Sequence, residues 1–162
     1  RGAGARRYQG LRNRCGSLYL SGLLSHSMRN LPVWVAAVWW GSLSTLGFFV
    51  VPMLFIHLPS PAMAGNMAAK LFTAQTGIST VCGLVLLMLF RSNRPLAPVD
   101  IAQSATLFIL GGVLLALLVE FGVAPHIVAR DNLRLWHGVG TAMYVVQWLC
   151  ATVIFLKLSR QH

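Results

Sequence analysis

Four long runs of apolar residues, separated by short polar stretches, dominate the chain. They extend over residues 33–56, 71–90, 101–125 and 135–156. A helix rises about 1.5 Å per residue, so about 20 apolar residues cross the roughly 30 Å hydrocarbon core of a bilayer. The runs lack the alternation of apolar and polar residues that is typical of membrane β-barrels. The pattern therefore predicts an all-α, polytopic membrane protein whose four transmembrane helices form a bundle.

Prolines mark the end of the first apolar run. The sequence VVPMLFIHLPSP, residues 50–61, has Pro52 inside the run, His57 where it stops, and two more prolines just beyond. A residue that precedes proline rarely adopts the helical backbone conformation. These two prolines therefore indicate a turn at the end of the helix. The other breaks are also short, which predicts a single transmembrane domain, residues 31–158, without internal repeats.

The composition excludes an ordinary soluble domain. Hydrophobic residues make up 56% of the 162 residues, charged residues only 10%, and the mean hydropathy is +0.68. Soluble domains carry roughly a quarter charged residues. The formal net charge of +10 is confined to tails and loops, where it signals topology, so we expect a lipid bilayer and no nucleic acid as partner.

The basic residues predict how the helices are oriented in the membrane. Ten would share one side and three the other: Arg1, Arg6, Arg7, Arg12, Arg14, Arg29, Arg91, Arg94, Lys157 and Arg160 against Lys70, Arg130 and Arg134. Cytoplasmic loops carry an excess of lysine and arginine. The pattern predicts that both termini are cytoplasmic, and we expect a multi-pass protein of the bacterial inner membrane.

Residues 1–30 form a basic segment that differs from the rest of the chain. Residues 1–27 contain no acidic residue and open on glycine and arginine, whereas Met28 followed by an apolar run has the form of a natural start. Three interpretations remain open: a stretch that does not belong to the native protein, a disordered basic tail, or a transit peptide of similar composition.

Small residues recur on three of the predicted helices at spacings that favour close packing. The stripes are Gly65, Ala69, Thr73 and Gly77; Gly112, Ala116, Glu120 and Ala124; and His137, Gly140, Thr141, Tyr144 and Gln147. Close approach through small residues drives helix association in lipid, so we expect these faces to point into the bundle. Alternatively, they dock another membrane protein or a second copy, and the chain is a structural or assembly subunit.

Glu120 is the acidic residue of the predicted transmembrane helices, because Asp100 and Asp131 fall in loops. A carboxylate near a helix centre costs a few kcal/mol, so intramembrane acids usually face protein, water or a partner. Glu120 precedes Pro125 by little more than one turn, which places it near the outer end of the helix. It is either an interfacial acid bonded to a neighbouring helix or a group that binds a ligand or relays a proton.

Three histidines, His57, His126 and His137, fall at the predicted outer ends of the helices, with several methionines nearby. Imidazole and thioether groups bind copper and haem iron, so all three are candidate metal ligands, and His57 and His137 are candidate haem ligands. Their spacing matches no fixed metal motif. Histidines also occur at membrane interfaces without any ligand, and that interpretation stays open.

The stripe on the fourth helix suggests a further role. His137, Tyr144 and Gln147 would line a path for a small solute or a proton from the outer face. Motifs of soluble enzymes are absent from the sequence: there is no P-loop, no G-x-G-x-x-G and no serine nucleophile with a suitable aspartate. The sequence therefore favours a protein without enzyme activity.

The run WWGSLSTLGFFVVPMLFIHLPSPAMAGNMAAKLF carries a resemblance to a known family. The matching positions are Trp40, Gly41, Phe49, Pro52, Leu54, Phe55, Leu58, Pro59, Gly65, Leu71 and Phe72, with Pro125 and His137-Gly138 further on. This pattern resembles the small membrane proteins of domain of unknown function 4149, which are similar to the animal transmembrane protein 205. The resemblance extends from residue 33 to the end of the fourth helix and implies a four-helix membrane protein without assigned catalytic residues.

A second, weaker likeness concerns the sequence VVPMLFIHL. It is similar to the end of the first helix in the haem-associated membrane protoporphyrinogen oxidases and, more loosely, in the copper-resistance D proteins, where a Pro-x-Leu-Phe run reaches a histidine. This likeness implies that His57 is a ligand of haem or copper. The companion motifs that those oxidases carry in their other helices are absent from this sequence.

Overall fold

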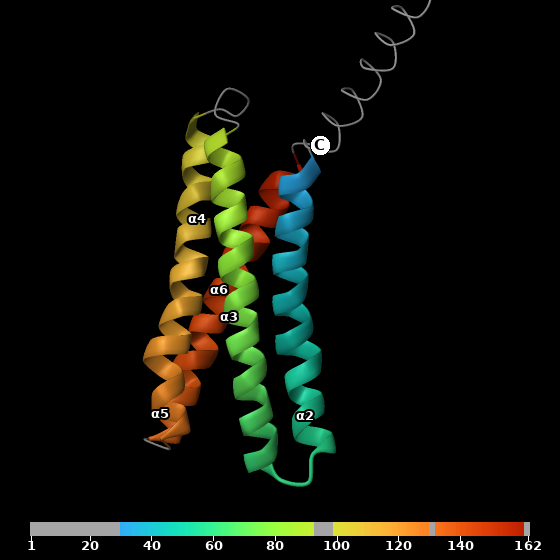
Figure 1. The fold of residues 1–162 in the computed structure, drawn as a ribbon, viewed down its shortest axis with the longest axis vertical. Helices are drawn as coiled ribbons and strands as arrows, with labels where there is room; N and C mark the ends of the chain where they lie inside the picture. The colour runs from blue at the N-terminus through green and yellow to red at the C-terminus, as the bar shows by residue number, and fades with distance from the viewer. Residues whose placement is uncertain (1–29, 93–98, 130–131, 161–162) are drawn as a thin grey trace, which may run out of the picture. The chain divides into compact units, whose positions relative to one another are not determined.

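The computed structural model describes residues 30–92, 99–129 and 132–160 (Figure 1). The chain divides into two units, Arg1–Pro32 and Val33–His162. Most of the predicted basic segment, residues 1–29, lies outside the described residues, so its three interpretations stay open. The second unit covers all but the first two residues of the predicted transmembrane domain, residues 31–158.

The described residues form helices and no strand. Their order is a first helical stretch over residues 30–45, η1 (Leu46–Val50), α2 (Val51–His57), α3 (Pro61–Ser92), α4 (Val99–Leu118), η2 (Val119–Val123), α5 (Ala124–Val128) and α6 (Leu133–Ser159). Residues 30–45, η1 and α2 follow one another without a break and are called the first span. The elements α4, η2 and α5 do the same and are called the third span.

Four helices are long and apolar enough to cross a membrane, as judged by length and composition. They are Asn30–His57, Pro61–Arg91, Ser104–Ile127 and Arg134–Ser159. The predicted fold class, an all-α protein with four potential membrane-spanning helices, is therefore confirmed. A helix satisfies most of its backbone hydrogen bonds within itself, which is what a backbone in hydrocarbon requires.

The second helix begins ten residues earlier than the sequence pattern predicts, at Pro61 instead of residue 71. Proline is favoured at the first position of a helix because its missing N–H has no partner there in any case. Ser60 supports this start, since its carbonyl accepts a bond from the Ala64 N–H (3.1 Å) and its hydroxyl accepts one from the Met63 N–H (3.3 Å). These local contacts outweigh the lower hydropathy of the first turns.

Proline shapes the first and third spans in the same way. Pro52 and Pro125 each stand at the second residue after a five-residue π-helix. Proline cannot donate to the carbonyl four residues before it. In each span the preceding residue bonds five residues back instead, so that the N–H of Val51 reaches the Leu46 carbonyl and the N–H of Ala124 reaches that of Val119. Such π segments often occur at functional sites.

The core of the second unit is a cluster of buried apolar side chains contributed by all four helices. Its members are Ala36, Trp39, Leu43, Cys82, Leu86, Ile109, Ala151, Ile154 and Leu158. The helix α4 packs against both α3 and α6, and α5 packs against α6. The helix α2 packs against α3, and Figure 1 shows the two ribbons side by side.

The structure corrects one of the three expected packing faces. On α3 the buried side chains are Ala64, Ala68, Gln75 and Ser79, whereas a Cβ added at Gly65 or Gly77 would meet no atom within 4 Å. Of the expected inward stripe of α3, Thr73 and Gly77 are exposed and Gly65 and Ala69 are half-buried. The stripe therefore lies at the edge of the packing and not at its centre. Small size permits close packing but does not say which face a helix buries.

The other two expected faces, on α4 and α6, agree better with the structure. Gly112 and Ala116 of α4 are buried, and a Cβ at Gly112 would lie 2.9 Å from the Trp39 ring, so this face points inward as expected. On α6, Gln147 is buried and Gly140 packs near Val123. His137 and Thr141, by contrast, are exposed, so only part of the α6 stripe packs inside.

Candidate functional site

His57 is the last residue of α2, and its side chain is exposed at the end of the first span. Its Nδ1 atom lies 3.0 Å from the backbone carbonyl oxygen of Met53, one turn earlier. A carbonyl only accepts hydrogen bonds, so Nδ1 carries the proton and donates. With the proton on Nδ1, the Nε2 atom is the ring nitrogen that faces away from this bond and can act as a ligand.

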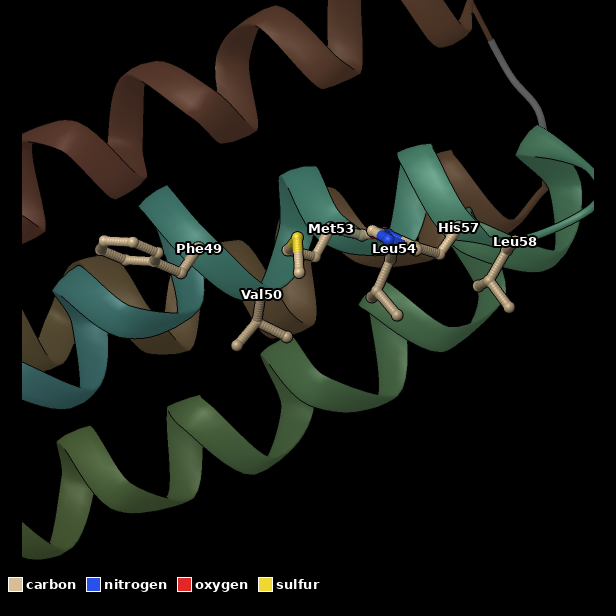
Figure 2. Close-up of a pocket in the computed structure, with 6 residues that line it drawn as sticks. All are labelled: Phe49, Val50, Met53, Leu54, His57 and Leu58. Carbon is tan, nitrogen blue, oxygen red and sulfur yellow. The ribbon is translucent and has the colours of Figure 1, made fainter.

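The same end of the first span borders a shallow apolar hollow that is largely open to the outside, called the cavity below; it measures about 530 Å³. It is lined by Phe49, Val50, Met53, Leu54, His57 and Leu58. Figure 2 shows these side chains along α2 and the preceding turn, with Val50 and Leu54 reaching toward α3. Ligand sites are mostly apolar with a few placed polar groups, and this hollow shares that composition, with one imidazole among apolar side chains.

Glu120 lies in η2, where its side chain is half-buried. Its Oε1 atom accepts a 2.9 Å hydrogen bond from the hydroxyl group of Thr73 in α3. The same hydroxyl lies 3.2 Å from the Ala69 carbonyl, so its single proton is shared between two acceptors. The structure therefore contains the bond to a neighbouring helix that the first interpretation of Glu120 expects.

His126 and His137 lie on α5 and on the first turns of α6. The ring of His126 stacks on Trp136, with ring centroids 4.1 Å apart and planes at 4°. His137 is exposed, and its backbone carbonyl accepts a 2.8 Å bond from the Thr141 hydroxyl. Within the described part of the chain, no three histidine, cysteine or acidic residues are grouped closely enough to hold a metal ion. The three predicted histidine ligands are therefore not assembled into one site.

Tyr144 and Gln147 both make contacts between helices. The Tyr144 hydroxyl donates a 2.8 Å bond to the Leu43 carbonyl of the first span. The Gln147 side-chain amide, which is buried, donates a 3.0 Å bond to the Ser79 hydroxyl of α3. Both polar groups named for a solute or proton path thus hold α6 against other helices.

Gln147 belongs to a buried polar network that the sequence analysis missed. The Gln75 amide donates to the hydroxyls of Ser42 (3.0 Å) and Ser79 (3.4 Å), so Ser79 receives bonds from two glutamines. The network joins the first span, α3 and α6. A signal was present, because Gln75 and Ser79 stand four residues apart in an apolar helix and therefore share a face, and polar side chains in such helices hydrogen-bond across helices.

Aromatic contacts join the first span to α6 beside this network. The indole N–H of Trp148 donates a 2.9 Å bond to the Ser44 hydroxyl. Trp40 stacks on Phe155 with centroids 5.5 Å apart and planes at 9°. This hydrogen bond and this stacked pair lie beside the buried polar network. The network is therefore part of the packing of the bundle.

Comparison with known proteins gives one match. The family described as domain of unknown function (DUF4149) matches residues 34–135, which is more than half of the chain. The matched region includes His57, Glu120 and His126 and ends before His137. No curated protein and no solved structure matches the chain.

Proposed function

This chain belongs to the DUF4149 family, and from that premise we propose that it is a multi-pass membrane protein that binds haem at the cavity beside His57. The family description names no activity, so the proposal depends on the geometry of one side chain. The hydrogen bond between His57 Nδ1 and the Met53 carbonyl is the observation that carries it.

Histidine ligands of metals usually donate their second ring N–H to a carbonyl or a carboxylate. This bond fixes the tautomer and the orientation of the ring. His57 has this arrangement: its Nδ1 atom donates to the Met53 carbonyl oxygen, 3.0 Å away, and its Nε2 atom is left to bind iron. An axial histidine supplies one ligand to haem iron, so a single imidazole suffices where a bare metal ion would need several ligands.

The surroundings of His57 suit the macrocycle as well as the iron. The other residues that line the cavity are apolar, and Phe49 and Met53 are 71% and 54% exposed. A flat apolar ring laid against them would remove apolar surface from the membrane interface, while its carboxylates could stay in water. The likeness of the Pro52–His57 run to the membrane protoporphyrinogen oxidases and the copper-resistance D proteins agrees with this choice of ligand.

The proposal includes an orientation. By the positive-inside rule, the end with the basic residues is cytoplasmic and the end with His57 faces the other side, which in a bacterial inner membrane is the periplasm. A haem or copper ligand would then be met at the outer face. The distribution of lysine and arginine supports this arrangement.

The test is an absorption spectrum of the detergent-purified protein after expression with a haem precursor, with iron, copper and zinc measured on the same sample. A Soret band with stoichiometric iron is expected. His57→Ala should abolish it, and His137→Ala decides between one and two histidine ligands. Because the described residues do not group His137 with other ligands, we expect that variant to keep the band.

Copper is the other outcome that supports the role of His57. Met53 lines the same cavity one turn before His57, so a thioether and an imidazole are both available to a soft copper ion. Stoichiometric copper that is lost in both Met53→Leu and His57→Ala would identify it. A metal-free, colourless protein after haem and copper supply would contradict the proposal.

A second candidate function is that of an assembly subunit, and it is favoured by the small-residue face of α3. A Cβ added at Gly65 or Gly77 would meet no atom within 4 Å. Thr73 between them is exposed, although its hydroxyl donates to Glu120 of η2. Small residues spaced by four allow the backbone of a partner helix to approach closely. This face could dock another membrane protein or a second copy of this chain.

Substitution and crosslinking in membranes separate the two functions. Gly77→Leu should remove crosslinked species if α3 docks a partner, whereas His137→Ala on the exposed part of α6 should leave them unchanged. Gly77→Ala is the matched control, because a methyl group still permits close packing. Unchanged crosslinking in Gly77→Leu would exclude this face as the docking surface.

A further inference from the structure

The buried polar network contains an acceptor that its own hydrogen bonds do not use. Ser42 donates its hydroxyl proton to the Trp39 carbonyl (2.9 Å), so toward Gln75 it can only accept. The Nε2 atom of Gln75 therefore faces Ser42, and its two hydrogens go to the hydroxyls of Ser42 and Ser79. No described residue donates a hydrogen bond to the Oε1 atom of Gln75.

The amide of Gln147 also has an unused polar atom. Its Nε2 atom donates one hydrogen to the Ser79 hydroxyl, and no described residue donates to its Oε1 atom. If this amide turned over, Oε1 would accept from Ser79, and Nε2 with its two hydrogens would take the outer position. In either orientation, one polar atom of the Gln147 amide faces away from Ser79 and needs a partner.

Both amides are buried near the middle of their helices. Gln75 and Gln147 are 5% and 3% exposed, and they stand about midway along the candidate spans Pro61–Arg91 and Arg134–Ser159. An amide that is removed from water without a compensating hydrogen bond is strongly disfavoured. Because hydrocarbon offers neither donors nor acceptors, the missing partner must lie inside the bundle.

The unused glutamine oxygens border space that a small molecule can reach. Among the described residues, the side-chain polar atoms that are both enclosed and without a partner are the indole nitrogens of Trp39 and Trp40. The Oε1 atoms of Gln75 and Gln147 have no partner but are not enclosed in this way, so the small exposed surface of these side chains includes them. The Nε2 atoms of the two amides lie 3.4 and 3.0 Å from Ser79 Oγ, so both amides belong to one small region.

We propose that Gln75 and Gln147 together bind a water molecule in the interior of the bundle. Water both donates and accepts hydrogen bonds, so it satisfies the Gln75 oxygen and either polar atom that Gln147 presents. Buried waters in proteins typically make about three hydrogen bonds to polar groups that otherwise lack a partner. A cation fits less well, because the two glutamines and the two serines of the network carry no charge to offset it. The water adds a link between α3 and α6.

The experiment is NMR spectroscopy of the isotope-labelled, detergent-purified chain, which detects cross-peaks between water and side-chain N–H groups. A bound water gives cross-peaks of opposite sign in laboratory-frame and rotating-frame Overhauser spectra, whereas hydrogen exchange gives the same sign in both. We expect bound-water cross-peaks at the amides of Gln75 and Gln147 and none at the enclosed indole N–H of Trp39. Their absence at both glutamines would overturn the proposal. Cross-peaks at Trp39 as well would also overturn it, because water would then penetrate the bundle generally.

Gln147→Met tests whether the two amides share one water. Methionine keeps the length of the side chain but has no amide, so the cross-peak at Gln75 should be lost. Ser44→Ala is the matched control: Ser44 joins the first span to Trp148 of α6 but does not bond to either glutamine, so this variant should keep both cross-peaks. A Gln75 cross-peak that survives in Gln147→Met, or an equal loss in Ser44→Ala, would overturn the proposal. Thermal unfolding of each variant verifies that the chain is folded.

Discussion

The hydroxyl of Tyr144 donates a 2.8 Å hydrogen bond to the backbone carbonyl of Leu43, 101 residues earlier in the chain. The bond ties α6 to the first span three residues before η1 begins. The tyrosine ring reaches this position only because residue 47 is glycine, since a Cβ there would lie 2.8 Å from the Cε1 atom of Tyr144. Gly47 of η1 and Tyr144 of α6 thus pack directly against each other.

Gly47→Ala should destabilise the bundle. The added methyl group would overlap the Tyr144 ring, and overpacking of this kind costs about 1 to 3 kcal/mol. Thermal unfolding in detergent, followed by circular dichroism, measures the loss. Gly65→Ala is the control, because its methyl group would meet nothing within 4 Å and alanine is the better helix former by up to about 1 kcal/mol. Equal stability of the two variants would contradict the close contact.

Gly83→Ala should cost more than Gly47→Ala. A Cβ at Gly83 would overlap the Cγ2 atom of Val113 in α4, and valine has few alternative rotamers with which to yield. The double variant Gly83→Ala with Val113→Ala should recover part of the lost stability. The same unfolding measurement tests this, and a strictly additive double variant would show that the two residues do not meet.

The number and type of helices follow from the sequence because they depend on composition over about 20 residues, and no tertiary contact is needed to recognise such a run. The start of α3 did not follow in this way. Its first ten residues include Asn66 and Lys70, which lower the hydropathy, yet Pro61 and Ser60 begin the helix through local hydrogen bonds. Element boundaries depend on such capping contacts more than on average hydropathy.

The inward face of α3 could not be read from its small residues. It is set by partners far away in the chain: Gln75 bonds to Ser42, 33 residues earlier, and Ser79 accepts from Gln147, 68 residues later. These partners decide that the polar side chains are buried and that Gly65 and Gly77 lie at the edge of the packing. Spacing on a single helix contains no information about them.

The sequence located only part of the candidate site. The Pro-x-Leu-Phe run identified His57, but only the structure gives the bond to the Met53 carbonyl that leaves Nε2 available. His126 was expected beside the other histidines, and it stacks on Trp136 instead. Because Trp136 is ten residues away across a turn, this pairing depends on how the turn closes.

Gln147→Leu should weaken the bundle through the buried network. The substitution keeps the volume of the side chain and removes its bond to Ser79. Hydrogen bonds between transmembrane helices contribute about 0.6 kcal/mol on average and at most about 2 kcal/mol, so the loss should fall in that range. A double-mutant cycle with Ser79→Ala measures the pair. A coupling energy of zero would mean that Gln147 contributes by packing and not by its amide.

The bond between Thr73 and Glu120 gives the last prediction. Thr73→Val keeps the shape of the side chain and removes the donor, so η2 should lose its 2.9 Å bond to α3 and stability should fall by about 1 kcal/mol. Glu120→Gln keeps an oxygen that accepts from Thr73, so it should lower stability less than Thr73→Val does. Both are measured by thermal unfolding in the same detergent. Because Glu120→Gln leaves the helix contact in place, any change that it causes in haem or copper binding would be due to the charge, which separates the ligand role of Glu120 from its packing role.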